Sequence, residues 1–184
     1  NDIILLDNQY QLPMLRQQKK GEECRSLADF VIPKSVNGHS STVGLFVLSV
    51  KDTQLSCDCK DFQHLLRNSL CARFTEALAQ WMHNQLDEGL NMIRPAFGYS
   101  SCPDHSLKKD VFDILKAEEK IGVSLTSSYA IHPTTSLCGM LIVHPEARYF
   151  GIHEIGKDQF SAYCEKRNIS ESEGKKHIGN LLTN

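Results

Sequence analysis

The sequence lacks segments that would place it in a membrane or direct it to secretion. Its longest apolar runs, such as residues 43–50, contain Gly and Ser and are far shorter than the roughly 20 residues that span a bilayer. Residues 1–7 carry neither the basic segment nor the small-residue cleavage site of a signal peptide. Because the chain does not begin with Met, we expect a processed chain or part of a longer polypeptide. The missing signal peptide, together with the cysteine pattern described next, favours a location in the cytoplasm.

Excess charge of one sign is missing as well. The formal net charge is -2, with both signs interspersed along the chain, which excludes a basic nucleic-acid surface and a polybasic membrane segment. The seven cysteines are odd in number and follow no disulfide framework, so we expect reduced thiols that mostly fill apolar space. Cys57, Cys59 and His64 resemble half a zinc site, but no second ligand pair follows at the usual spacing.

The composition that remains is that of an ordinary folded domain. Of the 184 residues, 41% are hydrophobic and 23% are charged, and neither repeats nor low-complexity segments interrupt them. A chain of this length forms one large domain or two small ones, and we favour a single domain over residues 1–184.

Residues 58–88 carry the strongest helical signal. Their apolar residues recur every three to five positions, which predicts one long helix with a buried stripe, capped by Asp58 or Asp61. We expect Leu78 and Trp81 to belong to the core. The stripe comprises Phe62, Leu65, Leu66, Leu70, Phe74, Ala77, Leu78, Trp81, Met82 and Leu86.

The other expected helices and strands occur in separate groups along the chain. A helix over 106–121 buries Val111, Phe112, Leu115 and Ile121 and ends at Gly122. Two further helices follow, over 157–166 and after the capping-box sequence at 170–173. Strands are expected at 3–6, 42–50, 123–130, 136–143 and 149–155. This order predicts an α+β domain with a mainly antiparallel sheet flanked by helices.

The segment between the two long helices has the composition of a binding loop. Residues 93–105 read IRPAFGYSSCPDH, in which prolines stiffen the backbone and Gly98 permits close approach. Arg94 offers a planar guanidinium suited to a carboxylate, and Tyr99 offers an aromatic face suited to a sulfonium or a purine. A rigid connection whose arginine caps a helix would have the same composition. A Cys102–His105 nucleophile pair is disfavoured, because such pairs are usually distant in sequence.

This loop closely resembles the hallmark loop of the activation domain of cobalamin-dependent methionine synthase. Further segments resemble that family in the same order along the chain, so the resemblance covers nearly all of it. They are residues 15–18, 27–31, 73–77, 125–130, 144–145, 148–150, 158–159 and 163.

The resemblance implies a fold, a function and partners. The fold is a twisted, C-shaped antiparallel sheet with helices, and the function is S-adenosylmethionine binding for the reactivation of oxidised cob(II)alamin. In this reaction flavodoxin or an equivalent reductase delivers an electron, and the cobalamin is carried by the cobalamin-binding domain of the synthase. The chain is an accessory module of methionine biosynthesis and not a complete enzyme by itself.

The resemblance also implies the residues that hold the cofactor. Arg94 would bind the methionyl carboxylate, and the backbone from Ala96 through Gly98 to Tyr99 would hold the ligand, with the Tyr99 ring near the methyl group. Glu76, on the long helix, matches an acidic residue of the site.

Two aromatic residues match the border of the adenosyl group. They are Tyr149 and Phe150, and for both of them a place in the sheet core is the competing interpretation. We expect no catalytic residue and no metal site, since the electron and the corrin perform the chemistry.

The sequence departs from the family at its N-terminal side. The family has a longer N-terminal part with an acidic residue for the methionyl amino group, and Asp29 is not an obvious substitute for it. The alternative function is therefore a non-catalytic corrinoid-protein partner that has lost S-adenosylmethionine binding. An independent small-molecule methyltransferase is disfavoured, because the glycine-rich strand-to-helix turn of the common methyltransferase fold is missing.

Overall fold

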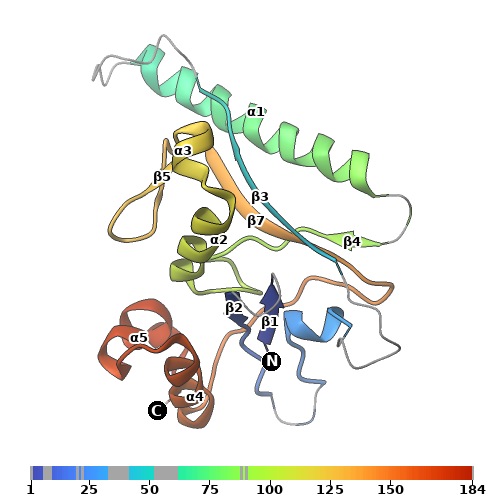
Figure 1. Cartoon of the computed structure of the whole chain (residues 1–184), viewed down its shortest axis with the longest axis vertical. Helices are drawn as coiled ribbons and strands as arrows, with labels where there is room; N and C mark the ends of the chain where they lie inside the picture. Colours follow the sequence, from blue (N-terminus) through green and yellow to red (C-terminus); the bar gives the residue numbers. More distant parts are fainter. Residues whose placement is uncertain are drawn as a thin grey trace.

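A three-stranded antiparallel sheet forms the centre of the molecule (Figure 1). The computed structural model describes residues 2–5, 10–19, 21, 23–32, 42–51, 62–87, 89 and 91–183. The sheet has the order β3-β7-β4, formed by β3 (Val43–Ser49), β7 (Ser136–Val143) and β4 (Met92–Ile93). Two two-stranded sheets accompany it, β1 (Asp2–Leu5) with β2 (Tyr10–Pro13) and β5 (Ser124–Leu125) with β6 (Ile131–His132). The expected α+β fold with antiparallel pairing is confirmed.

The central sheet is covered by helices on both faces. Figure 1 shows α1 (Phe62–Leu86) on one side of β3 and β7, and α2 (Lys108–Leu115) with α3 (Ala117–Ile121) on the other. The alternation of β7 fits this arrangement, because successive side chains of a strand point to opposite faces. Met140 and Ile142 belong to the main core with Val111 of α2, whereas Leu141 packs with Phe46 on the α1 side.

The expected long helix is present, but its large apolar residues are not buried. Over the described residues α1 runs from Phe62 to Leu86, and the proposed caps Asp58 and Asp61 lie outside them. The residues that α1 buries are small: Cys71, Thr75 and Ala79. The expectation for the stripe was therefore wrong for most of its members. Those exposed are Phe62, Leu65, Leu66, Leu70, Phe74, Ala77, Trp81 and Leu86.

The expected helix over 106–121 is divided into short pieces. A 3-10 turn, His105–Leu107, leads into α2, and Lys116 with a φ of 51° separates α2 from α3. Gly122 ends α3 in the left-handed region, as expected. Ile121 is 42% exposed, so its expected burial was wrong. The break at Lys116 rotates α3 relative to α2 and moves Ile121 away from the core.

Two of the expected strands do not form as predicted. Residues 123–130 contribute only β5, because a turn follows in which Thr126 N–H donates to Ala130 O and Tyr129 N–H to Thr126 O, each at 2.9 Å. Residues 149–155 form no strand, and their backbone bonds go to separate segments: Ile152 N–H donates to Ser100 O and Ile155 N–H to Leu181 O, both at 2.8 Å. Residues 149–155 thus have the apolar pattern of a strand but do not pair continuously with one neighbouring strand.

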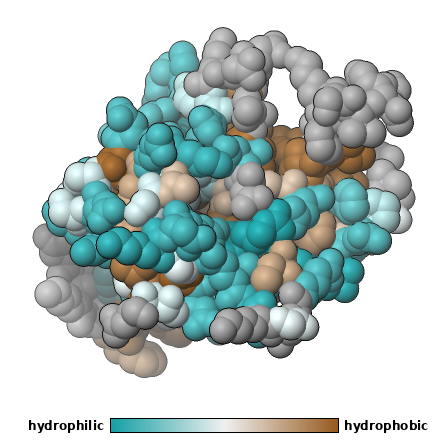
Figure 2. All heavy atoms as spheres, turned by 90° about the horizontal axis from the view of Figure 1, so that it is seen from below, coloured by the Kyte–Doolittle hydropathy of each residue, from teal (hydrophilic) through white to brown (hydrophobic). Residues whose placement is uncertain are grey.

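The C-terminal helices form a second small core. α4 (Lys157–Arg167) buries Phe160 and Tyr163, as expected, and these pack with Ile178 at the end of α5 (Glu171–Ile178). Ser170 caps α5 by accepting a hydrogen bond from Glu173 N–H at 3.2 Å. Seen from this end of the molecule, the surface is mostly hydrophilic (Figure 2).

Cysteine and membrane expectations can be compared with the described residues. The five cysteines among them are free thiols, and four of these are buried; Cys57 and Cys59 lie outside the described part. In the part of the chain that the structure describes, no helix is both long and apolar enough to cross a membrane. Within the same residues no three or more His, Cys, Asp or Glu side chains come together as a metal site.

Candidate functional site

The loop that follows β4 continues alongside the central strand β7. Pro95 O accepts a hydrogen bond from Met140 N–H at 3.0 Å, and Ala96 forms an antiparallel bridge with Gly139. A Cβ at Gly139 would lie 2.8 Å from Pro95 O, so only glycine allows the loop to approach this closely. Phe97 is almost completely buried in the main core. The beginning of the loop is therefore fixed to the sheet on both sides of Ala96.

The loop then folds into a tight turn that exposes one aromatic ring. Gly98 has a φ of 89°, its N–H donates to Cys102 O at 2.7 Å, and Cys102 N–H donates to Tyr99 O at 2.9 Å. Tyr99 lies at the tip with 65% of its surface exposed. Two backbone groups expected to face a ligand, Gly98 N–H and Tyr99 C=O, are thus already bonded within the turn.

His105 packs against Gly98 of this turn, and Lys108 in turn contacts His105. A Cβ at Gly98 would lie 2.1 Å from His105 Cε1, so the imidazole fills the space beside that glycine. Lys108 Nζ lies 2.7 Å from His105 Nδ1 and donates to Tyr129 O at 3.1 Å. Since an ammonium only donates, Nδ1 accepts and the neutral ring carries its proton on Nε2. Burial lowers the pKa of Lys108, and burial together with Lys108 lowers the pKa of His105.

Asp104 joins the loop to the second core. Its carboxylate accepts from Ser106 N–H and from the Tyr163 hydroxyl, both at 2.6 Å, and Asp104 and Tyr163 are buried. Burial, with the charge of Asp104 second, raises the pKa of Tyr163 well above its usual value. Cys102 is buried as well, and burial strongly raises the pKa of its thiol. A buried neutral thiol is a poor nucleophile, which further disfavours a Cys102–His105 pair.

Arg94 connects three parts of the chain. Its backbone N–H donates to the Tyr149 hydroxyl at 2.8 Å, and its guanidinium Nη1 donates to the backbone carbonyl of Ala79 on α1. Within the described residues, the Ala79 bond is the one its side chain makes, and a guanidinium carries five N–H donors. Arg94 therefore keeps further guanidinium N–H groups that can donate to a ligand carboxylate.

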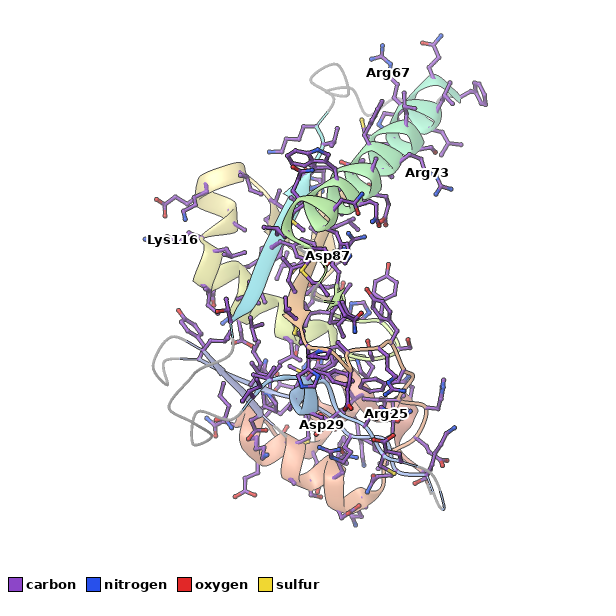
Figure 3. All side chains as sticks on the ribbon, turned by 90° about the vertical axis from the view of Figure 1, so that its right-hand side faces the viewer. Arg25, Asp29, Arg67, Arg73, Asp87 and Lys116 are labelled. Carbon is purple, nitrogen blue, oxygen red and sulfur yellow. The ribbon has the colours of Figure 1, made fainter. Side chains whose placement is uncertain are left out.

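Glu76 lies on the same helix, just under one turn before Ala79. Its side chain is exposed and borders a hollow of about 380 Å³ between α1 and the start of β7. Thr75, beside it, donates to Thr135 O at 2.7 Å and fixes α1 to that strand end. Arg73, on the same wall of the hollow, projects outward from α1 (Figure 3).

The two predicted aromatic residues have different surroundings. Tyr149 is 63% exposed and is held through its hydroxyl by Arg94. Phe150 is partly buried, packs against both hydrophobic cores, and meets Phe30 edge-on with ring centroids 6.3 Å apart. The structure thus brings Tyr149 to Arg94, whereas Phe150 has the surroundings of the competing core interpretation.

Asp29 makes local contacts in the 3-10 helix whose Phe30 meets Phe150. It pairs with Arg16 and accepts from Ser26 N–H at 2.9 Å, which caps the 3-10 helix Leu27–Phe30. In Figure 3 Asp29 lies in the lower half of the molecule and α1 in the upper half. Its carboxylate is used locally and is not near Glu76.

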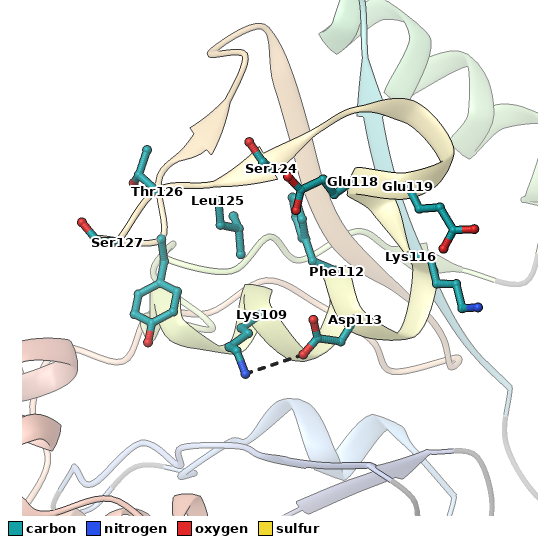
Figure 4. A pocket seen from close by; sticks show the side chains of 11 residues that line it. Lys109, Phe112, Asp113, Lys116, Glu118, Glu119, Ser124, Leu125, Thr126 and Ser127 are labelled. Carbon is teal, nitrogen blue, oxygen red and sulfur yellow. Dashed lines mark ion pairs between the residues drawn. The ribbon is translucent and has the colours of Figure 1, made fainter.

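A larger hollow lies elsewhere and contains none of the predicted residues. It measures about 780 Å³ and is lined by α2, α3 and the turn before β6 (Figure 4). Its charged side chains have both signs, and Lys109 pairs with Asp113 at 3.7 Å. The groups that match a zwitterionic, sulfonium-bearing ligand, namely Arg94, Glu76, Tyr99 and Tyr149, lie outside it. Size alone therefore does not locate the candidate site.

Comparisons with known proteins identify the family and the fold of the chain. Residues 1–168 match the family model described as vitamin B12 dependent methionine synthase, activation domain. A solved structure described as "Crystal Structure of the MetH Reactivation Domain bound to AdoHcy" has a TM-score of 0.87 and 26% sequence identity to this chain. The match covers 100% of this chain and 66% of that chain, so this chain spans about two thirds of the relative's length.

Proposed function

Since the chain belongs to the activation-domain family of vitamin B12-dependent methionine synthases, we propose that it binds S-adenosylmethionine and supports the reductive remethylation of cob(II)alamin. The cobalamin would be held by the cobalamin-binding domain of the synthase, and flavodoxin or an equivalent reductase would deliver the electron. The observation that carries the proposal is the position of Arg94. Its backbone N–H is bonded to the Tyr149 hydroxyl, and its guanidinium is bonded to the carbonyl of Ala79, three residues after Glu76 on α1.

The chemistry of these side chains fits the ligand. S-adenosylmethionine carries one carboxylate, one ammonium, a sulfonium and a purine. Arg94 complements the carboxylate, Glu76 complements a cationic group, and the exposed rings of Tyr99 and Tyr149 suit the sulfonium or the purine. When bound, the ligand supplies the methyl group that the partner's cobalamin accepts.

The protein contributes orientation. The loop is fixed to β7 through Pro95 and Ala96 and to the second core through Asp104. A rigid loop loses little conformational entropy when a ligand binds, so more of the interaction energy appears as affinity. The proposal places no proton transfer on any residue of this chain.

Replacing Arg94 tests the site directly. In isothermal titration calorimetry, Arg94→Ala should weaken S-adenosylmethionine binding by about 1.5–3 kcal/mol, the value of a hydrogen bond to a charged group. Arg148→Ala is the control, because its exposed side chain donates only to Glu146 O among the described residues. Equal affinities of the two variants would remove Arg94 from the site, and no binding by the wild-type chain, with or without the synthase, would refute the proposal.

Glu76→Gln tests whether the negative charge of Glu76, rather than the size of its side chain, contributes to ligand affinity. Loss of one exposed charge about 4 Å from a cation costs about 1 kcal/mol, so S-adenosylmethionine affinity should fall about five-fold. S-adenosylhomocysteine, which has no sulfonium, should lose less affinity if Glu76 faces the sulfur. Glu165→Gln on α4, also exposed, is the control; an equal loss for both ligands would place Glu76 near another part of the ligand.

One observation favours the alternative of a corrinoid-protein partner without ligand binding. Gly98 N–H and Tyr99 C=O are bonded within the turn, which leaves fewer backbone groups for a cofactor. Under that alternative, a cobalamin-binding domain would associate with the chain equally well with and without S-adenosylmethionine, and Arg94→Ala would not change the association.

A further inference from the structure

Most of the large apolar side chains of α1 point away from the sheet that the helix covers. Small residues, Cys71, Thr75 and Ala79, face the sheet. On the opposite side lies a row that we call the α1 stripe, in which five large side chains are 54–76% exposed. The α1 stripe consists of Phe62, Leu66, Leu70, Phe74, Ala77 and Trp81.

The α1 stripe is continuous and straight enough to act as one surface. Its members follow each other at intervals of three or four residues, so they lie on neighbouring turns of the helix. From Phe62 to Trp81 the stripe extends about 28 Å at a rise of 1.5 Å per residue. A patch of this length is comparable to the largest apolar patch of a typical monomer, and such patches often mark interaction sites.

We propose that the α1 stripe is the contact surface between two copies of this chain, with their α1 helices antiparallel about a twofold axis. A twofold interface requires a surface that is complementary to itself. With the axis between Leu70 and Phe74, each Leu70 faces the other copy's Phe74. Leu66 then lies within one residue of the position opposite the other copy's Ala77, whose small side chain leaves room for it. Phe62 likewise lies within one residue of the position opposite Trp81, so aromatic rings meet near both ends of the stripe.

The α1 stripe has enough exposed apolar area for an interface between two copies. The exposed parts of three aromatic and two leucine side chains amount to about 500–600 Å² per copy, from the usual areas of such side chains. Two copies would bury at most about 1,000–1,200 Å², which passes the roughly 1,000 Å² expected of a biological interface and corresponds to a weak dimer. Polar residues border the stripe, among them Gln63, Arg73 and Gln80, as expected for an interface with an apolar centre and a polar rim.

The net charge of the chain opposes association only weakly. The chain has a formal net charge of only -2, so two copies repel each other weakly. The stripe itself contains no charged side chain. Glu76 lies about 120° around the helix axis from Leu70 at 100° per residue, so it is not part of the stripe. Arg73, at the border of the stripe, also lines the hollow beside Glu76.

Leu70→Glu tests the proposal at the twofold axis. The wild-type chain should have about twice the mass of 20.7 kDa in sedimentation velocity and light scattering. In the variant, two unpaired carboxylates would be buried near the axis, so the dissociation constant should rise more than about 100-fold. The monomer should fold unchanged, because Leu70 is more than half exposed. Ile121→Glu on α3, an exposed apolar residue outside the stripe, should leave the dimer intact.

Two further measurements keep the result unambiguous. Phe74→Gln, which adds no charge, should also weaken the dimer, with far-UV circular dichroism confirming that both variants remain folded. Hydrogen exchange of α1 amides should slow as protein concentration rises. A wild-type chain with the mass of one copy would overturn the proposal, as would a dimer that survives Leu70→Glu. If the wild-type chain were monomeric and Leu70→Glu abolished binding to a cobalamin-binding domain, the stripe would belong to that partner instead.

Discussion

The hydrogen bond between Tyr163 and Asp104 joins the candidate binding loop to the C-terminal helices, and its loss has a predictable cost. Both residues are buried, and the hydroxyl lies 2.6 Å from Asp104 Oδ2. Tyr163→Phe removes only this oxygen, so packing is kept while one carboxylate oxygen loses its partner. Hydrogen bonds to charged groups contribute about 1.5–3 kcal/mol, and an unpaired buried acceptor adds to the cost. We expect the free energy of unfolding to fall by about 2–3 kcal/mol.

Urea unfolding followed by circular dichroism measures this loss. For a chain of this size the melting temperature should fall by about 4–12 °C. Tyr99→Phe is the matched control, because it removes an exposed hydroxyl and should change stability by less than about 0.5 kcal/mol. A Tyr163→Phe variant as stable as the Tyr99→Phe variant would contradict the reasoning.

The pKa of Tyr163 gives an independent check of the same bond. Since burial and Asp104 raise that pKa above 10.0, the folded state keeps its proton at a pH where the unfolded state has lost it. The stability is therefore complete below pH 10 and falls as the pH rises above 10. The Tyr163→Phe variant should lack this alkaline loss, and an identical pH profile for both chains would exclude the assigned cause.

Two more predictions concern the support of the loop. Gly98→Ala should destabilise the fold by more than Gly89→Ala, because both glycines have a positive φ but only Gly98 has His105 at 2.1 Å from the added Cβ; equal losses, each about 1 kcal/mol from the φ alone, would exclude the contact. Since the pKa values of His105 and Lys108 are both lowered, the unfolded state binds more protons and stability should rise with pH up to the ordinary pKa of lysine. Urea midpoints measured across this range should show a smaller rise for Lys108→Met than for the exposed control Lys109→Met, and equal rises would refute the assignment.

The helices were predictable because their signals are local. The spacing of apolar residues, Gly122 after α3 and Ser170 before α5 each act within one or two turns. The break at Lys116 was not predictable, since a left-handed lysine has no sequence signal comparable to glycine.

The direction of the α1 stripe could not be read from the sequence. Periodicity shows that a helix has an apolar face, but it does not say what covers that face. The sheet fills the space beneath α1 with Phe46, Met92 and Leu141. Because these side chains are large, the helix meets them mainly with small residues such as Ala79. Met82 also packs against them, whereas most of the other large residues of α1 point away.

The strand expected at 149–155 does not form, and the reason is related. Its apolar pattern is real, since Ile152 and Ile155 are buried. Backbone pairing, however, depends on which segment lies alongside, and here the partners are Ser100 and Leu181 on different parts of the chain. The loop residues were predicted as a group, whereas the roles of His105 and Lys108 in supporting Gly98 depend on contacts that no spacing rule gives.

The contacts of α1 make the two proposals separable. The helix holds the Arg94 guanidinium through Ala79 O and exposes Glu76 on one side, while the α1 stripe occupies another. A substitution at Leu70 should therefore change the mass of the assembly without changing S-adenosylmethionine affinity, and Glu76→Gln should do the reverse. If Leu70→Glu also weakened ligand binding, α1 would have to shift when the second copy is lost, since Leu70 and Ala79 share only the helix backbone between them. Coupling of that kind would mean that assembly controls the position of Arg94.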